Sequence, residues 1–191
     1  MNRINEKKLI QALNFFAFKE GGVISKIKAY KLLWLADRYH LRKYVRMITN
    51  DGYFAMPKGI VPTEAKHIMD GISNLKCGNY IKEYLHISDS ALSYASSKEP
   101  NMRVFSKTDT DALDVVWSNY GSLDASHLSA MSHRFPEWKR FKALIEDPNE
   151  LSSYSVCVDD FFVNYEDKTS LFVDDRELLE LTKELYKSEV I

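Results

Sequence analysis

Cysteine is scarce in this 191-residue chain, which contains only Cys77 and Cys157. The two lie far apart and form no CxxC pair, so we expect free thiols and no disulfide framework. Long apolar runs are also missing, since no stretch approaches the roughly 18 residues that can span a bilayer. The first residues lead into an amphipathic segment and lack the apolar run of a secretory signal. These absences predict a cytoplasmic protein without a membrane partner.

A large excess of charge of one sign is absent as well, because 26 basic and 27 acidic residues give a net charge of −1. The charges are nevertheless uneven. Residues 1–48 hold 11 basic and 3 acidic residues, residues 49–143 are balanced, and residues 144–191 hold 4 basic and 13 acidic residues. The near-zero total argues against strong, specific nucleic-acid binding, in which basic side chains neutralise phosphates. The oppositely charged ends can pack together, or each can face a different partner.

Apolar and aromatic residues are plentiful, at 45% and 13% of the chain. Their spacing predicts a mainly α fold, a single compact helical domain with a small antiparallel β element. We expect one core that includes Leu33, Trp34 and Trp117. Helices are predicted over residues 5–19, 26–44, 62–73, 107–120, 123–133, 136–144, 159–164 and 174–189. Strands are predicted at 53–56 and in a hairpin within residues 79–97 that turns at 88–90.

The helix predicted over residues 26–44 is apolar on two sides, which places it at the centre of the domain. Asp37 lies in the middle of one apolar strip. Because an unpaired buried carboxylate is costly, Asp37 needs hydrogen-bond donors. We expect it to be buried and to fasten the turn at residues 48–52 to the helix. The candidate donors are backbone N–H groups of that turn and three side chains: Lys31, Arg38 and His40.

The same helix offers two other interpretations. Asp37 and His40 could form an acid–base or metal-binding pair, although a metal site usually needs roughly three or four ligands. The other histidines form no ligand-spaced motif, so we assign no catalytic residue, no metal and no cofactor. The basic side chains along the helix form either a solvated face or a partner-binding surface, and they are Lys28, Lys31, Arg38, Arg42 and Lys43. From these we select three candidate partner-binding residues: Lys31, Arg38 and Arg42.

Two ordered blocks in the first third of the chain resemble a known family signature. KLLWLADRYH occupies residues 31–40, and ITNDGYFAMPKGIVP occupies residues 48–62. They are similar to the K-L-L-Y-[FL]-[AS]-D, H-L, I-T-G-D-x-[YF]-x-A and G-P-V-P elements of the Panacea domain, the SocA-like antitoxin domain that was first described in phage-associated proteins. FSKTD at residues 105–109 and the segment from 120 to 138 resemble its later blocks. The motif residues that match are Lys31, Asp37, His40, Thr49, Asp51, Gly59 and Pro62.

The likeness covers residues 27–144, so we expect residues 1–191 to form one Panacea-like domain in which 145–191 is a helical extension. Departures from the family pattern are small. Trp34 replaces tyrosine or phenylalanine, Asn50 replaces glycine, and Ile60 replaces the first proline of G-P-V-P. Because asparagine tolerates positive φ, Asn50 can keep the turn.

The resemblance implies an antitoxin. It would neutralise a toxin encoded by an adjacent gene through direct protein–protein binding, or deliver that toxin to a protease as an adaptor. The family implies no catalytic residue, and the toxin's identity is not carried over.

Two other functions stay open. Residues 107–133 could form a helix-turn-helix around Gly121 and regulate a gene, but residues 123–131 contain no lysine or arginine. An uncharacterised enzyme could use Asp37 and His40.

The last predicted helix, over residues 174–189, suggests how a partner is held. Its apolar residues are expected to dock the helix on the domain, and they are Leu178, Leu179, Leu181, Leu185 and Tyr186. Its acids are spread more widely, so we expect several to face water and to attract a toxin: Asp175, Glu177, Glu180, Glu184 and Glu189.

Overall fold

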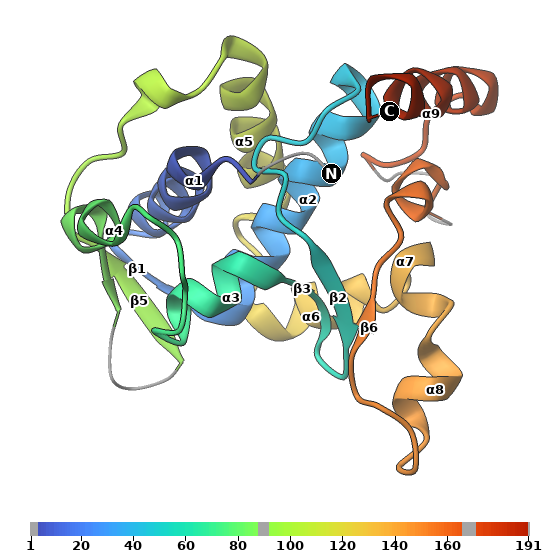
Figure 1. Ribbon diagram of the computed structural model, residues 1–191, viewed down its shortest axis with the longest axis horizontal. Helices are drawn as coiled ribbons and strands as arrows, with labels where there is room; N and C mark the ends of the chain where they lie inside the picture. The colour runs from blue at the N-terminus through green and yellow to red at the C-terminus, as the bar shows by residue number, and fades with distance from the viewer. Residues whose placement is uncertain (1–3, 88–91, 166–170, 191) are drawn as a thin grey trace.

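Helix α2 (Lys26–Tyr44) runs through the middle of the computed structural model, which describes residues 4–87, 92–165 and 171–190 (Figure 1). The side chain of Ser25 caps the helix by accepting a hydrogen bond from the Lys28 N–H. Fifteen of its 19 residues are buried, which confirms the central helix that the sequence predicts. Three helices pack around it: α1 (Glu6–Lys19), α5 (Lys107–Tyr120) and α6 (Ala125–Ser132).

Two small antiparallel sheets lie on either side of α2 (Figure 1). The first has the strand order β1 (Val23–Ser25), β5 (Ser93–Ser96), β4 (Leu85–Ile87). The second has the order β3 (Gly59–Pro62), β2 (Tyr53–Met56), β6 (Tyr154–Ser155). Strands β4 and β5 pair as the predicted hairpin, whose turn at residues 88–90 lies outside the described residues.

Short helices connect these parts and cover the ends of the molecule. They are α3 (Thr63–Met69), α4 (Gly78–Tyr84), α7 (Pro136–Lys139), α8 (Lys142–Glu146) and the 3-10 helices η1 (Met102–Val104) and η2 (Val158–Phe162). Helix α9 (Arg176–Val190) ends the chain and lies across one outer edge (Figure 1). In the part of the chain that the structure describes, no helix has the length and hydropathy needed to cross a membrane.

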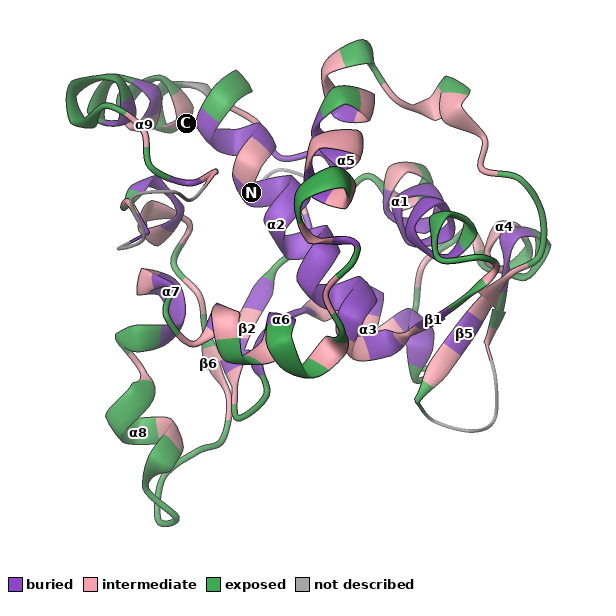
Figure 2. Cartoon of the chain, turned by 180° about the vertical axis from the view of Figure 1, so that it is seen from behind, coloured by how far each residue is buried: buried purple, intermediate pink, exposed green. Residues whose placement is uncertain are grey.

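The buried apolar residues form one cluster that extends from α1 and α2 to the C-terminal segment. Leu33 and Trp34 are fully buried, as predicted. Trp117 is only half-buried, because it lies near the outer end of α5, where its ring packs on Phe16 and beneath the Lys28 ammonium. The burial pattern follows this arrangement, with the buried residues concentrated on α2 and the green, exposed ones on α8 and α9 (Figure 2).

Several predicted elements differ in the structure. Helix α3 stops four residues early, since the chain turns through Gly71, whose φ is +70°. The helix predicted over 136–144 is broken into α7 and α8, and the one predicted at 159–164 is the 3-10 helix η2. Residues 79–84, predicted as part of the hairpin, form helix α4, and strands β1 and β6 and the 3-10 helix η1 were not predicted. These elements are short, and tertiary pairing and packing decide their conformation more than their own sequence does.

Candidate functional site

Asp37 is completely buried and accepts hydrogen bonds from the turn that follows α2. The N–H groups of Ile48 and Thr49 donate to its Oδ1 at 2.7 and 3.0 Å, and the Tyr53 hydroxyl donates to Oδ2 at 2.7 Å. The Thr49 hydroxyl is the fourth donor. Burial raises the pKa of Asp37, and the four hydrogen bonds oppose that rise. The prediction that Asp37 fastens this turn is confirmed, although Lys31, Arg38 and His40 are not its donors.

Residues of the turn also form hydrogen bonds that connect it to the next helix, α3. The Asp51 N–H donates to the Thr49 hydroxyl oxygen. The Asp51 carboxylate in turn accepts from the Glu64 and Ala65 N–H groups at 2.9 and 3.0 Å, where it holds the first turn of α3. Burial raises the pKa of Asp51 to about 7. Asn50 has a φ of +56°, the left-handed conformation that the sequence led us to expect there.

Lys31 is also fully buried, and it crosses from α2 to the β2–β3 hairpin. Its Nζ donates to the Ile60 carbonyl oxygen at 2.5 Å, and it forms no ion pair within the described residues. Burial lowers the pKa of Lys31 to about 7. Gly59 lies directly beside it with φ +91°, and a Cβ there would lie 3.0 Å from Lys31 Nζ and 1.8 Å from Ser132 Oγ. Pro62, the last motif residue, ends β3 and precedes α3.

His40 faces α5 and not Asp37. Its Nδ1 lies 2.7 Å from the Arg46 carbonyl oxygen, and its Nε2 lies 3.0 Å from Thr108 Oγ1 and 3.3 Å from Asp109 Oδ1. Burial lowers the pKa of His40. The structure therefore does not bring Asp37 and His40 together as an acid–base or metal-binding pair, and they serve different interfaces of α2.

Asp109 joins three segments at that second interface. It accepts a hydrogen bond from Lys8 Nζ on α1 at 2.6 Å, forms an ion pair with Arg46 at 2.9 Å, and completes the capping box of α5 with Ser106. Burial alone would raise the pKa of Asp109, but hydrogen bonds from Lys8, the Ser106 N–H and Arg46 hold it below its ordinary value.

Arg38 forms an ion pair with Glu137 in which both side chains are fully buried. Arg38 Nε donates to Glu137 Oε1 at 3.0 Å, and Trp34 Nε1 donates to the same oxygen at 3.0 Å. The guanidinium lies 4.9 Å from the ring centres of both Phe135 and Phe172. Burial raises the pKa of Glu137, whereas the charge of Arg38 lowers it.

Arg42 is covered by the C-terminal segment. Its guanidinium donates to both the Asp174 carboxylate and the carbonyl oxygens of Phe161, Val163 and Phe172. The prediction of an accessible basic surface is therefore wrong for Lys31, Arg38 and Arg42, because strand β3 covers the first and residues 161–165 and 172–174 cover the other two. Lys28 is buried as well and pairs with Glu20, whereas Lys43 is partly exposed and pairs with Asp174.

Sequence reasoning missed three carboxylates that complete these networks: Asp109, Glu137 and Asp174. Each had a local signal only. Asp109 stood in a capping box, Glu137 followed the helix-starting Pro136, and Asp174 began the last predicted helix. Nothing local to these positions indicated which distant cation each one meets.

Helix α9 differs from α2 because it carries exposed leucines and acidic side chains on the outer surface. Its Leu179 and Thr182 are buried and its Tyr186 ring packs 6.0 Å from Phe162, whereas three of its leucines are exposed: Leu178, Leu181 and Leu185. The prediction that the leucines jointly dock the helix is therefore wrong for those three. Exposed acids are confirmed at Asp175, which directly precedes α9, and at Glu177, Glu180 and Glu184 on it, and the side chain of Glu189 lies outside the described residues.

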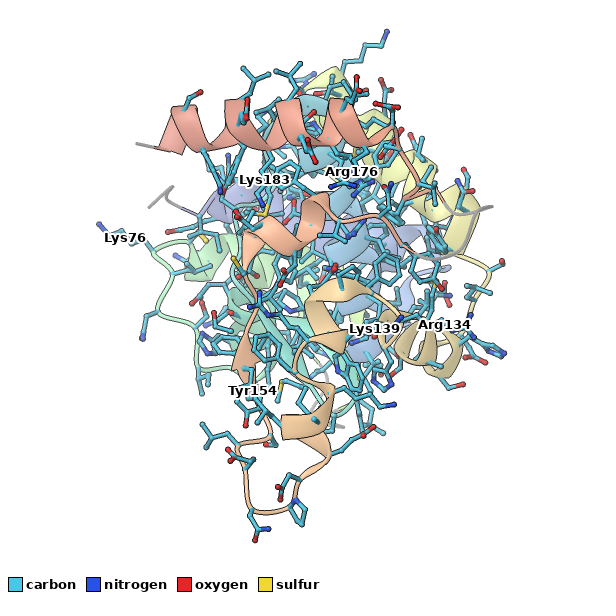
Figure 3. All side chains as sticks on the ribbon, turned by 90° about the vertical axis from the view of Figure 1, so that its right-hand side faces the viewer. Lys76, Arg134, Lys139, Tyr154, Arg176 and Lys183 are labelled. Carbon is cyan, nitrogen blue, oxygen red and sulfur yellow. The ribbon has the colours of Figure 1, made fainter. Side chains whose placement is uncertain are left out.

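A hollow of about 380 Å³ separates part of α9 from η2. Its lining includes the ion pair between Lys183 and Asp159, with the labelled Lys183 on the side of α9 toward the body (Figure 3). Within the described residues, no group of three or more histidine, cysteine or carboxylate side chains is placed to hold a metal ion.

Comparison with protein families matches residues 30–139 to the family described as antitoxin SocA-like, Panacea domain. This span is more than half of the chain and contains the polar networks of α2 up to Glu137. It ends before the segment that covers Arg42 and before α9. No curated protein and no solved structure matches the chain.

Proposed function

Because this chain belongs to the SocA-like antitoxin family with the Panacea domain, we propose that it neutralises a protein toxin encoded by an adjacent gene through direct binding. The family match is the observation that carries this proposal. It supports an antitoxin role in general, and the mode of neutralisation is the part that we add.

The position of the motif residues supports a binding function over a catalytic one. Lys31, Asp37, Asp51 and Gly59 are buried, and their contacts fasten α2 to the neighbouring turn, hairpin and helix. Such residues specify the scaffold, whereas a partner is recognised by what the scaffold exposes. We therefore assign the seven motif residues a structural role and place the toxin contact on the outer surface.

Residues 145–191 belong to this scaffold in our proposal. Phe161 and Phe172 are fully buried in the common core, and residues 161–164 and 172–174 accept hydrogen bonds from the guanidinium groups of Arg38 and Arg42. A chain that ended near residue 144 would leave Arg38 and Arg42 without these partners. We therefore treat residues 1–191 as one cytoplasmic antitoxin domain with an integral C-terminal extension.

Coexpression tests the proposal directly. The neighbouring open reading frame is induced in a host cell with and without this chain, and growth is followed. We expect the neighbour alone to arrest growth and the pair to grow, with both proteins recovered together from the lysate. A neighbour that is harmless alone, or toxicity that this chain does not relieve, would overturn the proposal.

Measuring the toxin's half-life separates direct neutralisation from delivery to a protease. Direct binding predicts an unchanged or longer half-life in the presence of this chain. An adaptor would shorten it. A gene regulator would instead bind DNA, and for this chain we expect only weak, salt-sensitive DNA binding, since helix α6 contains no lysine or arginine.

A further inference from the structure

Three leucines of α9 form an exposed apolar face. Leu178, Leu181 and Leu185 are 52%, 53% and 47% exposed, and their spacing of three and four residues puts them on one side of the helix. A single exposed leucine is ordinary, but an aligned set on one helix marks an interaction surface more often. We call these three residues the leucine stripe.

The stripe is exposed although α9 is firmly docked. The adjoining side of the helix is fixed by buried Leu179 and Thr182, by Tyr186 against Phe162, and by ion pairs of Lys183 and Lys187 with Asp159 at 2.9 Å. Figure 3 shows α9 as the outermost element along this edge of the molecule. The helix therefore presents the stripe outward on a fixed support, which lowers the entropic cost of binding a partner.

Acidic side chains border the stripe on one side. Glu177 lies four residues before Leu181 and Glu184 lies three residues after it, so both are its neighbours on the helix surface. Both are exposed, and neither forms an ion pair with a described residue. Glu180, by contrast, pairs with Arg176. The stripe thus combines an apolar centre with negative charge that no described group neutralises.

We infer that the leucine stripe docks the toxin, and that the toxin presents an apolar strip with lysine or arginine beside it. This inference rests on the proposed function and names the surface that performs it. The leucines would lose water at the centre of the interface, where most binding energy arises. Glu177 and Glu184 would attract the basic border of the toxin and raise the association rate.

A second copy of this chain fits the stripe less well. Two identical surfaces related by a two-fold axis meet as the same patch on each subunit. The acidic border would then approach its own copy, and like charges across an interface disfavour association. A basic border on the occupant removes this repulsion.

Replacement of the stripe by glutamine tests the inference. We expect Leu178→Gln, Leu181→Gln and Leu185→Gln together to weaken binding to the purified product of the adjacent open reading frame by at least about 100-fold, as loss of central contacts does. The thermal midpoint should be unchanged, because the three side chains are half exposed and glutamine suits a helix. The matched control is Leu144→Gln with Leu151→Gln, which replaces exposed leucines elsewhere and should leave binding unchanged.

Charge reversal tests the acidic border separately. Glu177→Lys with Glu184→Lys should slow association several-fold at low salt and reduce its dependence on salt. The control, Glu99→Lys with Glu146→Lys, makes the same change in charge away from α9 and should leave the association rate near that of the wild type. An association rate that falls equally in both variants would assign the effect to net charge and contradict a local acidic border.

These experiments distinguish failure of the proposed function from failure of the proposed docking surface. If the wild-type chain does not bind the neighbour's product, the proposed function fails and the inference fails with it. If the wild type binds and the folded glutamine variant binds equally well, the inference is overturned while the proposed function stands. If the glutamine variant changes only the mass of the isolated chain in light scattering, the stripe holds a second copy, and the inference is again wrong.

Discussion

Arg42 and Asp174 are 132 positions apart and are joined by two hydrogen bonds, from Arg42 Nε at 3.0 Å and Nη2 at 2.8 Å. This pairing fixes the acidic C-terminal segment on the basic central helix. Part of the opposite charge at the two ends of the chain is therefore used inside the molecule. The acidic side chains Glu177, Glu180 and Glu184 of α9 stay exposed, whereas Arg38 and Arg42 of α2 are buried.

Removal of either partner should destabilise the fold, with the larger loss at Arg42. Arg42→Ala leaves the carbonyl oxygens of Phe161 and Phe172 without this donor and leaves Asp174 with Lys43 alone, and we expect the free energy of unfolding to fall by about 3–5 kcal/mol. Asp174→Ala should cost about 1–3 kcal/mol. Chemical denaturation measures both. Asp160→Ala is the control, because it breaks an ion pair with exposed Arg140 and should cost less than about 1 kcal/mol. Equal losses in all three variants would contradict a special role for the Arg42 pair.

Asp37 should matter for stability and not for a reaction. Asp37→Ala leaves two N–H groups and two hydroxyls without their acceptor, and we expect a loss of about 1–3 kcal/mol in the free energy of unfolding. Hydrogen exchange should increase first at Ile48 and Thr49, whose N–H groups donate to this carboxylate. Unchanged exchange at these two amides would show that Asp37 does not hold the turn.

Lys31 should make stability rise with pH. Its folded pKa of about 7 lies below its ordinary value of 10.5, so between these values the unfolded chain binds more protons than the folded chain. The free energy of unfolding then increases as pH rises from 7 to 9.5. In Lys31→Met this increase should be smaller, and the difference between the two proteins isolates Lys31 from other titrating groups. Parallel pH curves would mean that burial does not shift its pKa.

Gly59 tests how tightly the β2–β3 turn approaches α6. Gly59 and Gly21 both have a φ of +91°, but a Cβ at Gly59 would meet Ser132 whereas one at Gly21 would meet no atom within 4 Å. Gly21→Ala should cost roughly 1–2 kcal/mol, the strain of a left-handed residue. Gly59→Ala should cost more, since the clash adds to the same strain. Thermal or chemical unfolding compares the two, and similar losses would rule out the close contact.

The features that could be predicted from the sequence depend on residues close together in the chain. The bounds of α2 follow from its N-cap at Ser25 and from its apolar spacing, and Asp37 meets donors only 11 to 16 residues away. Arg38 and Glu137 are 99 residues apart, so their pairing depends on the path of the whole chain. Basic residues on a predicted helix suggested an exposed rim, because sequence alone does not show that a distant segment folds back over them.

We propose that this chain neutralises a toxin by binding it directly. Titration of the purified product of the adjacent gene with the purified chain, in the absence of any protease, measures that binding. Calorimetry should show saturable binding, and the toxic activity of that product should fall in proportion to the complex formed. If the purified proteins do not bind and toxicity persists at saturating concentrations of this chain, the claim is wrong.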